Sequence, residues 1–399
     1  MNQFALTPPQ RELMDRARGV AEEVLLPLAE AGQPGRINRP LVAALGEHGL
    51  LGRVFPGVGE KSAAADAGSR QVAALDLCLL RESIAQCCPE AETALALQGL
   101  AGYPILQSGT DRQAGAYLPG IAAGRLVAAF ALTEPEAGSD AAALSLAAER
   151  DGAGWRLTGE KLWISNAPDA DVYTVFARTT VGAGARGVSA FVVPADRPGL
   201  SGEPLEMISP HPIGRLVFDG VPVEPADLLG EQDRGFRVAM RTLDLFRPSV
   251  GAFAIGMAQA ALDAAAAHAV SRSAFGGTLA DRQAVGHLLA DATARVRAAR
   301  LLVYSAAAAY DAGAGNAALS AAAKLLATET AQQAIDAALQ VHGARALRRG
   351  HLLEQLYRDV RATRIYEGAS EVQRDIIARE LFAQARSRVE AASGSDDGR

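Results

Sequence analysis

Two short segments far apart in the chain contain side chains that could do chemistry together. Residues 130–140 read FALTEPEAGSD, and residues 364–374 read RIYEGASEVQR. In the second segment a carboxylate, Glu367, lies between a tyrosine and a glycine within an apolar helical region, where burying a charge is costly. The first segment is an acidic turn whose glycine and hydroxyl groups could hold an anionic cofactor. If the fold brings the two segments together, they supply a base beside a binding site.

These residues also have purely structural interpretations. Glu367 could be a surface carboxylate that caps the next helix, and the first segment could be a tight turn punctuated by proline and glycine. Trp163 could fill the core of a β domain instead of contacting a ligand. Arg272 and Gln283 could be solvated helix ends.

Three regions with different periodicities must position these side chains. Up to about residue 120, apolar residues recur at steps of three and four, which predicts amphipathic helices. From about 126 to 229, short β-favouring runs alternate with turn residues, as in a small antiparallel barrel or sandwich. From 235 to about 385, long alanine-rich helices return and suit an antiparallel bundle. The apolar period then ends, so we expect 386–399 to be a disordered tail.

The composition is that of an ordinary globular protein and argues against several functional classes. The chain has 399 residues, enough for two or three domains, of which 49% are hydrophobic and 21% charged. Its net charge of -6 argues against a nucleic-acid binder, which would be expected to have a basic face. Lysine occurs only at Lys61, Lys161 and Lys324, so nearly all basic residues are arginines.

Cysteine, histidine and hydropathy patterns predict neither a metal site nor a membrane span. Cys78, Cys87 and Cys88 are expected in one helix, without the spaced pairs of a zinc site or a disulfide framework. The six histidines lack metal-ligand spacing, so we expect them at the surface or at helix ends. No export signal is visible at the N-terminus, and no apolar run is long enough to cross a bilayer. The prediction is a cytoplasmic protein.

One motif matches a cofactor-binding fingerprint but lies in the wrong structural context. Residues 182–187 read GAGARG, which matches the dinucleotide-binding fingerprint. That fingerprint functions where a strand runs into a helix whose N-terminus faces the pyrophosphate. Here the next residues, VSAFVVP at 188–194, predict another strand. We therefore interpret the motif as a hairpin loop and expect any dinucleotide to be bound without a Rossmann domain.

The order of several further motifs resembles that of the acyl-CoA dehydrogenase family. After 132–140 come WISNA at 163–167, LGE at 229–231, RSAFG at 272–276, QVHG at 340–343 and IYEG at 365–368. Each motif is weak alone, but their order matches the helix–strand–helix layout from about residue 6 to 382. The resemblance implies a mainly α fold with a central β domain. Its parts would be an N-terminal α-helical domain (1–120), a middle β-barrel domain (121–232) and a C-terminal four-helix bundle (233–385).

The resemblance also implies a function. It predicts FAD-dependent oxidation of an acyl-CoA to the trans-2-enoyl-CoA, with Glu367 as the base for the α-proton and hydride transfer to flavin N5. Electrons would pass to an electron-transfer flavoprotein. The chain would assemble as a homotetramer or homodimer with FAD at subunit interfaces.

The proposed base needs help from its surroundings. A carboxylate with the reference pKa of about 4.3 removes a thioester α-proton slowly. Burial beside flavin and acyl chain would raise the pKa of Glu367, and hydrogen bonds to the thioester oxygen would stabilise the developing enolate. By resemblance, the backbone N–H of Glu367 and a ribityl hydroxyl of FAD donate those bonds. Gly368 would keep a side chain from crowding the substrate.

The resemblance assigns the ligand contacts residue by residue. Trp163 would flank the isoalloxazine, Ser165 would bond near flavin N5, and Arg272 would pair with a pyrophosphate. The full set of predicted cofactor-binding residues is Phe130, Leu132, Thr133, Gly138, Ser139, Trp163, Ile164, Ser165, Arg272, Phe275, Gln283, Gln340, Gly343, Ala369, Ser370 and Glu371. The predicted substrate-binding residues are Ser139, Asp244, Phe246, Arg247, Tyr366 and Gly368.

Two positions qualify this assignment. The family offers a second location for the base, which in this chain is Phe246, and a phenyl ring cannot accept a proton. The absence of that competitor supports Glu367, and Phe246 should narrow the acyl pocket. The family usually has a second glycine after Gly343, where this chain has Ala344. The Cβ of Ala344 is expected to affect FAD affinity.

Other functions are compatible with the same residues. The acyl group could be carried by an acyl-carrier protein in a biosynthetic pathway, or an oxidase could pass the electrons to oxygen. A related flavin monooxygenase would be expected to lack the base, which is present here. From other classes, the chain could be a non-catalytic flavoprotein that binds nucleic acid, or a helical scaffold without flavin.

Overall fold

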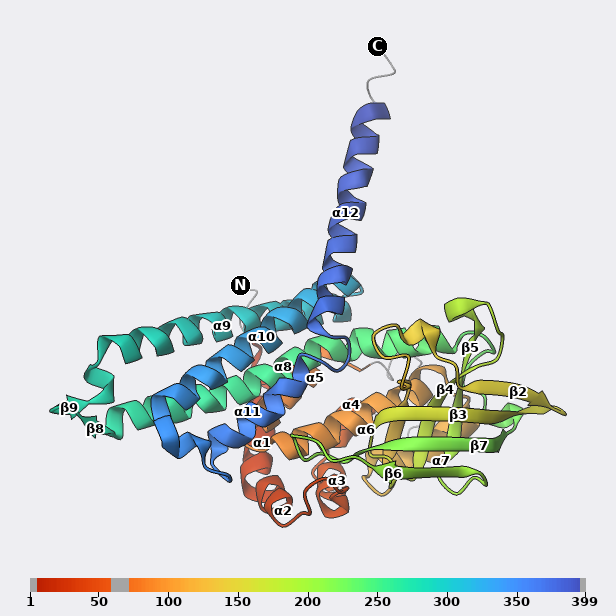
Figure 1. Cartoon of the computed structure of the whole chain (residues 1–399), viewed down its shortest axis with the longest axis horizontal. Coiled ribbons are helices and arrows are strands. Elements are labelled where there is room, and N and C mark those ends of the chain that lie inside the picture. The colour runs from red at the N-terminus through yellow and green to blue at the C-terminus, as the bar shows by residue number, and fades with distance from the viewer. Residues whose placement is uncertain (1–5, 59–71, 395–399) are drawn as a thin grey trace. The chain divides into compact units, whose positions relative to one another are not determined.

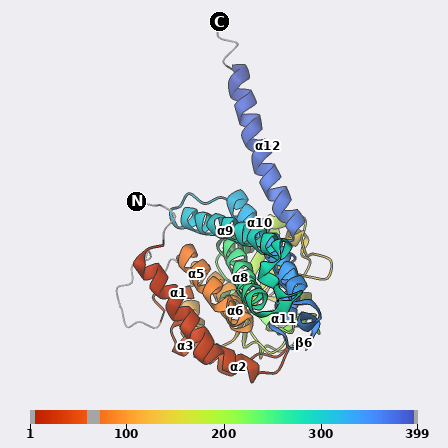
Figure 2. The ribbon, with the colours of Figure 1, turned by 90° about the vertical axis from the view of Figure 1, so that its left-hand side faces the viewer.

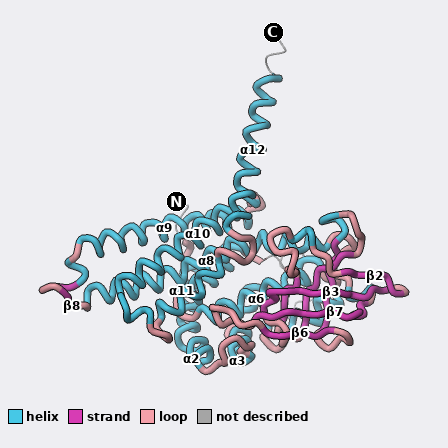
Figure 3. Tube along the Cα trace, in the orientation of Figure 1, coloured by secondary structure: helices cyan, strands magenta, loops and turns pink. Residues whose placement is uncertain are grey.

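The computed structural model describes residues 6–58 and 72–394 and divides the chain into two compact units, Met1–Phe246 and Arg247–Arg399. Helices come first along the chain, then strands, then helices again (Figures 1 and 3). The fold is the mainly α class predicted from the sequence, with a middle β domain between two helical regions. Lys61 and residues 395–399 lie outside the described residues.

Local capping sets where the first helices begin. Thr7 and Gln10 form a capping box ahead of the first helix, and Thr110 and Gln113 repeat it later. Helix α5 packs against both α1 and α6 (Figure 2). The helices up to residue 122 are α1 (Pro8–Val20), continued by a π-helical turn (Ala21–Leu25), α2 (Leu26–Glu30), α3 (Arg39–Glu47), α4 (Leu50–Val54), α5 (Ala74–Ala85), α6 (Pro89–Ser108) and α7 (Asp111–Ala122).

The cysteine prediction is wrong in one respect. Cys78 lies in α5, but Cys87 and Cys88 lie in the turn that precedes α6. Pro89 starts a new helix here because its fixed φ suits a first helical position. Burial raises the pKa of Cys87 to about 12 and that of Cys88 to about 11, so neither thiol is a ready nucleophile.

Seven strands form the sheet of the first unit. They are β1 (Ala128–Ala131), β2 (Ala147–Asp151), β3 (Gly154–Ser165), β4 (Val172–Arg178), β5 (Val188–Pro194), β6 (Leu200–Pro204) and β7 (Ile213–Val223). The order is β1-β4-β2-β3-β7-β6, with β5 also pairing with β4. The sheet forms the half-barrel of the predicted middle β domain, although β1 runs parallel to β4 where the sequence pattern suggested antiparallel pairing. Antiparallel β4 and β5 confirm residues 182–187 as a hairpin loop.

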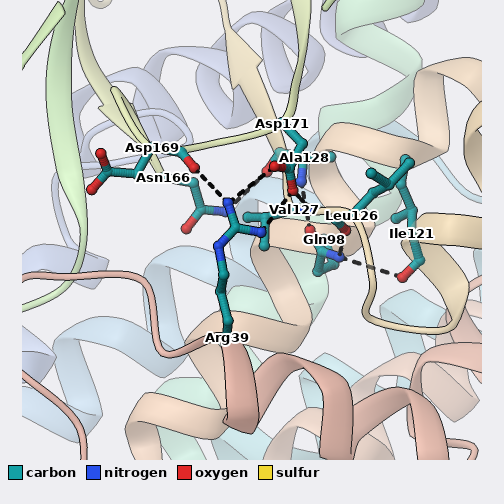
Figure 4. Close-up of polar contacts among 9 residues, drawn as sticks. All are labelled: Arg39, Gln98, Ile121, Leu126, Val127, Ala128, Asn166, Asp169 and Asp171. Atoms are coloured by element: carbon teal, nitrogen blue, oxygen red, sulfur yellow. Dashed lines mark hydrogen bonds and ion pairs between the residues drawn. The ribbon is translucent and has the colours of Figure 1, made fainter. Parts of the chain in front are cut away.

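A buried glutamine fixes the start of β1, the strand that leads into the acidic turn. The Oε1 atom of Gln98 accepts from the N–H of Ala128 at 2.8 Å, and its Nε2 donates to the carbonyl of Leu126 at 2.7 Å. Asp171 accepts from the N–H of Val127 at 2.7 Å and also pairs with Arg39 (Figure 4). Because Gln98 is buried and these bonds satisfy the backbone groups at the start of β1, they fix the position of this strand.

Helix α8 (Gly235–Ser271) belongs to both units. It is long and apolar enough, by length and composition, to cross a membrane, which corrects the expectation that no run reaches that length. Yet 67% of its most apolar stretch is buried inside the protein. This burial is typical of a core helix in a helical domain.

The second unit continues with α9 (Gln283–Asp311), α10 (Ala317–His342), α11 (Leu352–Thr363) and α12 (Ser370–Gly394), after a short hairpin of β8 (Ser273–Ala274) and β9 (Gly277–Thr278). Helix α10 packs against α9, α11 and α12. Helix α12 extends away from its neighbours, and residues 381–390 are all exposed (Figures 1 and 2). The sequence predicts disorder for 386–394, but α12 continues through these residues. Ala, Arg and Glu have high helix propensity, which favours a helix even without an apolar stripe.

Candidate active site

The acidic turn begins directly after β1 and is tied to β3. Phe130 packs on Phe176 with ring centroids 4.9 Å apart, and Leu132 is buried. The N–H of Leu162 donates to the carbonyl of Thr133 at 3.0 Å. The first unit thus brings together the two predicted flavin segments, 130–140 and 163–165. Gly138 and Ser139 lie exposed on this turn.

A buried ion pair lies beneath the turn. Lys161 is fully buried, and its Nζ lies 2.8 Å from Oε1 of Glu134 and 2.9 Å from the carbonyl of Leu132. Glu134 also accepts from the N–H groups of Ser145 and Leu146. Burial opposes ionisation of Glu134, but the charge of Lys161 and these hydrogen bonds hold the pKa of Glu134 below its usual value. Neither residue of the pair was singled out from the sequence as a site residue.

The backbone presents Trp163 at the surface in a strained conformation. Trp163 has φ 60°, lies where the β3–β7 register shifts, and is 50% exposed. A bulky residue in the left-handed region is uncommon, and bulges often re-aim a side chain beside an active site. The Trp163 side chain therefore does not pack in the core of the β domain. The side chain of Ile164 is buried in that core, and Ser165 is half-buried.

In the second unit, Glu367 lies in a turn between α11 and α12. Its φ is 52° and that of Gly368 is 95°, so two consecutive residues adopt left-handed conformations. The Nζ of Lys324 donates to the carbonyls of Tyr366 at 3.0 Å and Gly368 at 2.7 Å. Gln373 donates from Nε2 to the Gly368 carbonyl at 2.8 Å. Glu367 itself is half-buried.

A polar network fixes the start of α12 just after this turn. Ser370 donates from its hydroxyl to Oε1 of Glu329 at 2.7 Å, and Arg364 pairs with the other oxygen at 2.9 Å. Burial opposes ionisation of Glu329, but these two partners hold its pKa below the usual value. Ser370 is therefore a structural link to α10. Ala369 is half-buried and Glu371 is exposed.

The remaining predicted cofactor residues of the second unit lie in a hairpin or near helix ends. Phe275, 88% exposed with φ 53°, forms the tip of the β8–β9 hairpin with Gly276 at φ 78°. Two successive positive φ angles are typical of a tight hairpin turn. Arg272 directly follows α8, and Gln283 begins α9. Arg272, Gln283, Gln340, Gly343 and Ala344 are all exposed.

The predicted substrate residues on α8 differ in burial. Phe246 is fully buried and contacts Tyr103 in the first unit, with ring centroids 6.2 Å apart. A Cβ on Gly99 would lie 2.8 Å from the Phe246 ring, so α6 needs a glycine at this position. Asp244 is half-buried, and Arg247 is buried in the second unit. Phe246 therefore acts as a packing residue.

Three histidines that are distant in sequence form a cluster. The ring of His268 stacks on that of His342 at 4.2 Å, and His351 meets His342 edge-on at 5.4 Å. Sequence spacing gave no sign of it, although each residue does lie at a helix end. Among the described residues, no group of three or more His, Cys, Asp or Glu side chains has an arrangement that could hold a metal ion.

Comparison with known proteins identifies the family. Models of the N-terminal, middle and C-terminal domains of acyl-CoA dehydrogenases match residues 7–125, 129–221 and 233–382. The chain belongs to the acyl-CoA dehydrogenase family. It is an oxidoreductase of that family, as the resemblance predicted.

Relatives in the acyl-CoA dehydrogenase family align with nearly the whole chain. A cyclohexane-1-carbonyl-CoA dehydrogenase of Geobacter metallireducens is 34% identical, with 96% of this chain and 100% of the relative covered. A 3-(aryl)acrylate reductase of Clostridium sporogenes is 36% identical, with 94% and 98% covered. A dehydrogenation of the acyl-CoA dehydrogenase family is therefore the reaction class of this chain.

Several solved structures share the fold of this chain. A glutaryl-coenzyme A dehydrogenase in complex with glutaryl-CoA has a TM-score of 0.88 and 32% identity, covering 96% of this chain and 97% of that one. PigA with FAD and proline has a TM-score of 0.88 and 26% identity, covering 96% and 100%. The prolyl acyl carrier protein oxidase AnaB has a TM-score of 0.86 and 26% identity, covering 94% and 100%.

Proposed function

We propose that this protein binds FAD and oxidises an acyl thioester to the trans-2-enoyl thioester, with Glu367 as the base for the α-proton. The observation that carries the proposal is the turn at Glu367. A half-buried carboxylate is held there on a left-handed backbone by Lys324 and Gln373. Strained backbone maintained by surrounding structure is typical of functional sites.

The side chains at the surface of each unit fit the proposed cofactor. In the first unit, Trp163 offers an exposed aromatic face, with Ser165 at the end of the same strand and Ser139 in the turn that is hydrogen-bonded to that strand. In the second unit, Phe275 is exposed three residues after Arg272, whose guanidinium suits a pyrophosphate. These features support the cofactor set assigned from the sequence. Ile164 would contribute through its backbone, because its side chain is in the core.

Within this proposal the chain moves one proton and stabilises one charge. The carboxylate of Glu367 takes the proton from Cα of the thioester, and the N–H of Glu367 donates to the thioester oxygen, where negative charge develops. FAD, when bound, supplies the acceptor for the hydride that leaves Cβ. Gly368 adopts a φ of 95° next to the base, and a Cβ there would clash with Nε2 of Gln373. Phe246 cannot replace Glu367, because a phenyl ring accepts no proton and this one packs in the core.

The test is anaerobic reduction of the bound flavin by a panel of acyl-CoA thioesters. We expect bleaching by at least one thioester, and a rate about 10²–10⁴-fold lower in Glu367→Gln, the range for losing a general base. Asp375→Asn, which changes an exposed carboxylate on α12, should match the wild type. Bleaching of Glu367→Gln at the wild-type rate, or no bleaching by any thioester, would refute the proposal.

A carrier-protein substrate is the second candidate, and the likeness to AnaB favours it. We favour acyl-CoA because two relatives with CoA thioester names, at 34% and 32% identity, are more similar to this chain than AnaB is at 26%. Matched acyl-CoA and acyl-carrier-protein substrates compared for flavin reduction would separate the two. Peroxide formed in air would instead indicate an oxidase.

We further propose an electron-transfer flavoprotein as the electron acceptor, assembly as a homotetramer or homodimer, and a cytoplasmic location. The family resemblance supports the first two proposals. Reduction of an added electron-transfer flavoprotein tests the first, and light scattering of the FAD-bound protein tests the second. A monomeric mass would contradict the proposed assembly.

A further inference from the structure

Lys324 is buried at a position where an ammonium group is hard to explain by packing alone. Its side chain on α10 is 0% exposed, and burial lowers its pKa to about 8. The charged groups that act on it are Glu367, Arg247, Glu329 and Glu371, of which Glu367 has the largest effect. A buried ammonium needs hydrogen-bond acceptors and an opposite charge, and the turn at Glu367 supplies both.

The acceptors of Lys324 lie on both sides of Glu367. Nζ donates to the carbonyl of Tyr366, the preceding residue, and to that of Gly368, the following one. Gln373, fully buried on α12, donates from Nε2 to the carbonyls of Glu367 and Gly368 at 3.3 and 2.8 Å. These side chains fix the peptide planes around the left-handed residues, which an unsupported chain would rarely adopt.

The bond to Tyr366 also sets the direction of one N–H group. In a trans peptide the C=O of one residue and the N–H of the next point in opposite directions. The one cis bond among the described residues is Ala167–Pro168, so the Tyr366–Glu367 peptide is trans. Since the Tyr366 carbonyl points at Lys324, the N–H of Glu367 points away from α10. That N–H is the group proposed to hold the thioester oxygen.

We propose that Lys324 is a positioning residue for the reaction: it aims the N–H of Glu367 at the thioester oxygen and supplies a positive charge that keeps the Glu367 carboxylate ionised. This proposal rests on the proposed function of Glu367. Lys324 touches neither the substrate nor the reacting atoms in this scheme. It acts through two backbone carbonyls and through its charge.

The experiment compares Lys324→Met with the wild type as FAD-bound proteins. Met has a similar length without donors or charge. We expect flavin to stay bound and the limiting rate of its reduction by a thioester to fall about 10–100-fold. The acid limb of the pH–rate profile should move to higher pH, because the carboxylate loses its cationic neighbour. Thr328→Val, which removes a buried hydroxyl one turn along α10, is the matched control and should keep both properties.

The outcomes separate this proposal from the proposed function. If thioesters fail to reduce the wild-type flavin, the proposed function fails, and the positioning role falls with it. If they reduce the wild type but not Glu367→Gln, while Lys324→Met keeps the wild-type rate and pH profile, then only the role of Lys324 is overturned. A purely structural lysine would lower the melting temperature without moving the pH profile.

A second variant covers the case in which Lys324→Met does not fold. Gln373→Met removes the other bonds to the same turn without removing a buried charge. We expect a severalfold slower flavin reduction with an unchanged acid limb. A wild-type rate in Gln373→Met would contradict the importance of the turn geometry and overturn the proposal.

Discussion

The ammonium of Lys161 lies 2.8 Å from a carboxylate oxygen of Glu134, and both side chains are almost completely buried. Burial lowers the pKa of Lys161 to about 8, although the charge of Glu134 opposes that shift. The same ammonium bonds the carbonyl of Leu132 at the start of the acidic turn. In this arginine-rich chain, Lys161 and Lys324 each donate hydrogen bonds to backbone carbonyls of one predicted site segment. The compact ammonium of lysine can approach backbone carbonyls where a guanidinium fork would need more space.

We predict that Lys161→Met lowers the free energy of unfolding of the first unit by about 3–5 kcal/mol, because it leaves the charge of Glu134 buried without its partner. Both tryptophans of the chain, Trp155 and Trp163, lie in β3, so their fluorescence in a urea titration of the apoprotein reports on this sheet. Asp151→Asn is the control. It breaks the exposed pair with Arg156 and should cost less than about 1 kcal/mol. Equal effects of the two changes would contradict the buried-pair argument.

Trp163→Gly should separate flavin binding from stability. Glycine adopts φ 60° without the strain that a tryptophan has there, so apoprotein stability should be unchanged or higher. Loss of the aromatic face should weaken FAD binding by about 1 kcal/mol, or roughly fivefold. Fluorescence titration of the apoprotein with FAD measures the affinity, and a thermal melt measures the stability.

The matched control for this change is Trp155→Phe. Trp155 packs in the sheet core against Phe191, so shortening it should lower stability and leave FAD affinity unchanged. Should Trp163→Gly destabilise the apoprotein while binding FAD normally, the exposed tryptophan would be a structural residue.

The histidine cluster predicts a loss of stability on the acid side of neutrality. Burial, then the charges of neighbouring His342 and Arg345, lower the pKa of His268, and burial together with His342 lowers that of His351. The unfolded chain takes up these protons near pH 6.5, while the folded chain resists them. Stability present above about pH 6.5 is therefore lost as the pH falls through the folded pKa values.

Melting temperatures between pH 5.5 and 7.5 test this expectation. His268→Gln should flatten the pH dependence relative to the wild type, because it removes one of the stacked rings. His287→Gln, on an exposed part of α9, should leave the slope unchanged. Identical slopes in all three proteins would show that the cluster does not control acid stability.

Parts of the site depended on local signals and were predictable. The strand that ends at Ser165 follows from its β-favouring residues, and the hairpin at 182–187 follows from the strand pattern on its C-terminal side. Glu367 could be selected because a carboxylate between tyrosine and glycine is unusual in an apolar region. Family membership could be recognised because six motifs keep their order, and the domain models confirm it.

Other parts required the tertiary structure, because they join residues that are distant in sequence. The sequence shows that Lys161 and Lys324 are rare lysines, but only packing reveals that each is buried against backbone carbonyls. The stack of His268 on His342 joins the ends of two helices. Backbone strain at Trp163 and Glu367 is also invisible in the sequence, since either residue alone would prefer negative φ. Local patterns thus determined the elements and the family, while long-range contacts decided which polar groups hold the site.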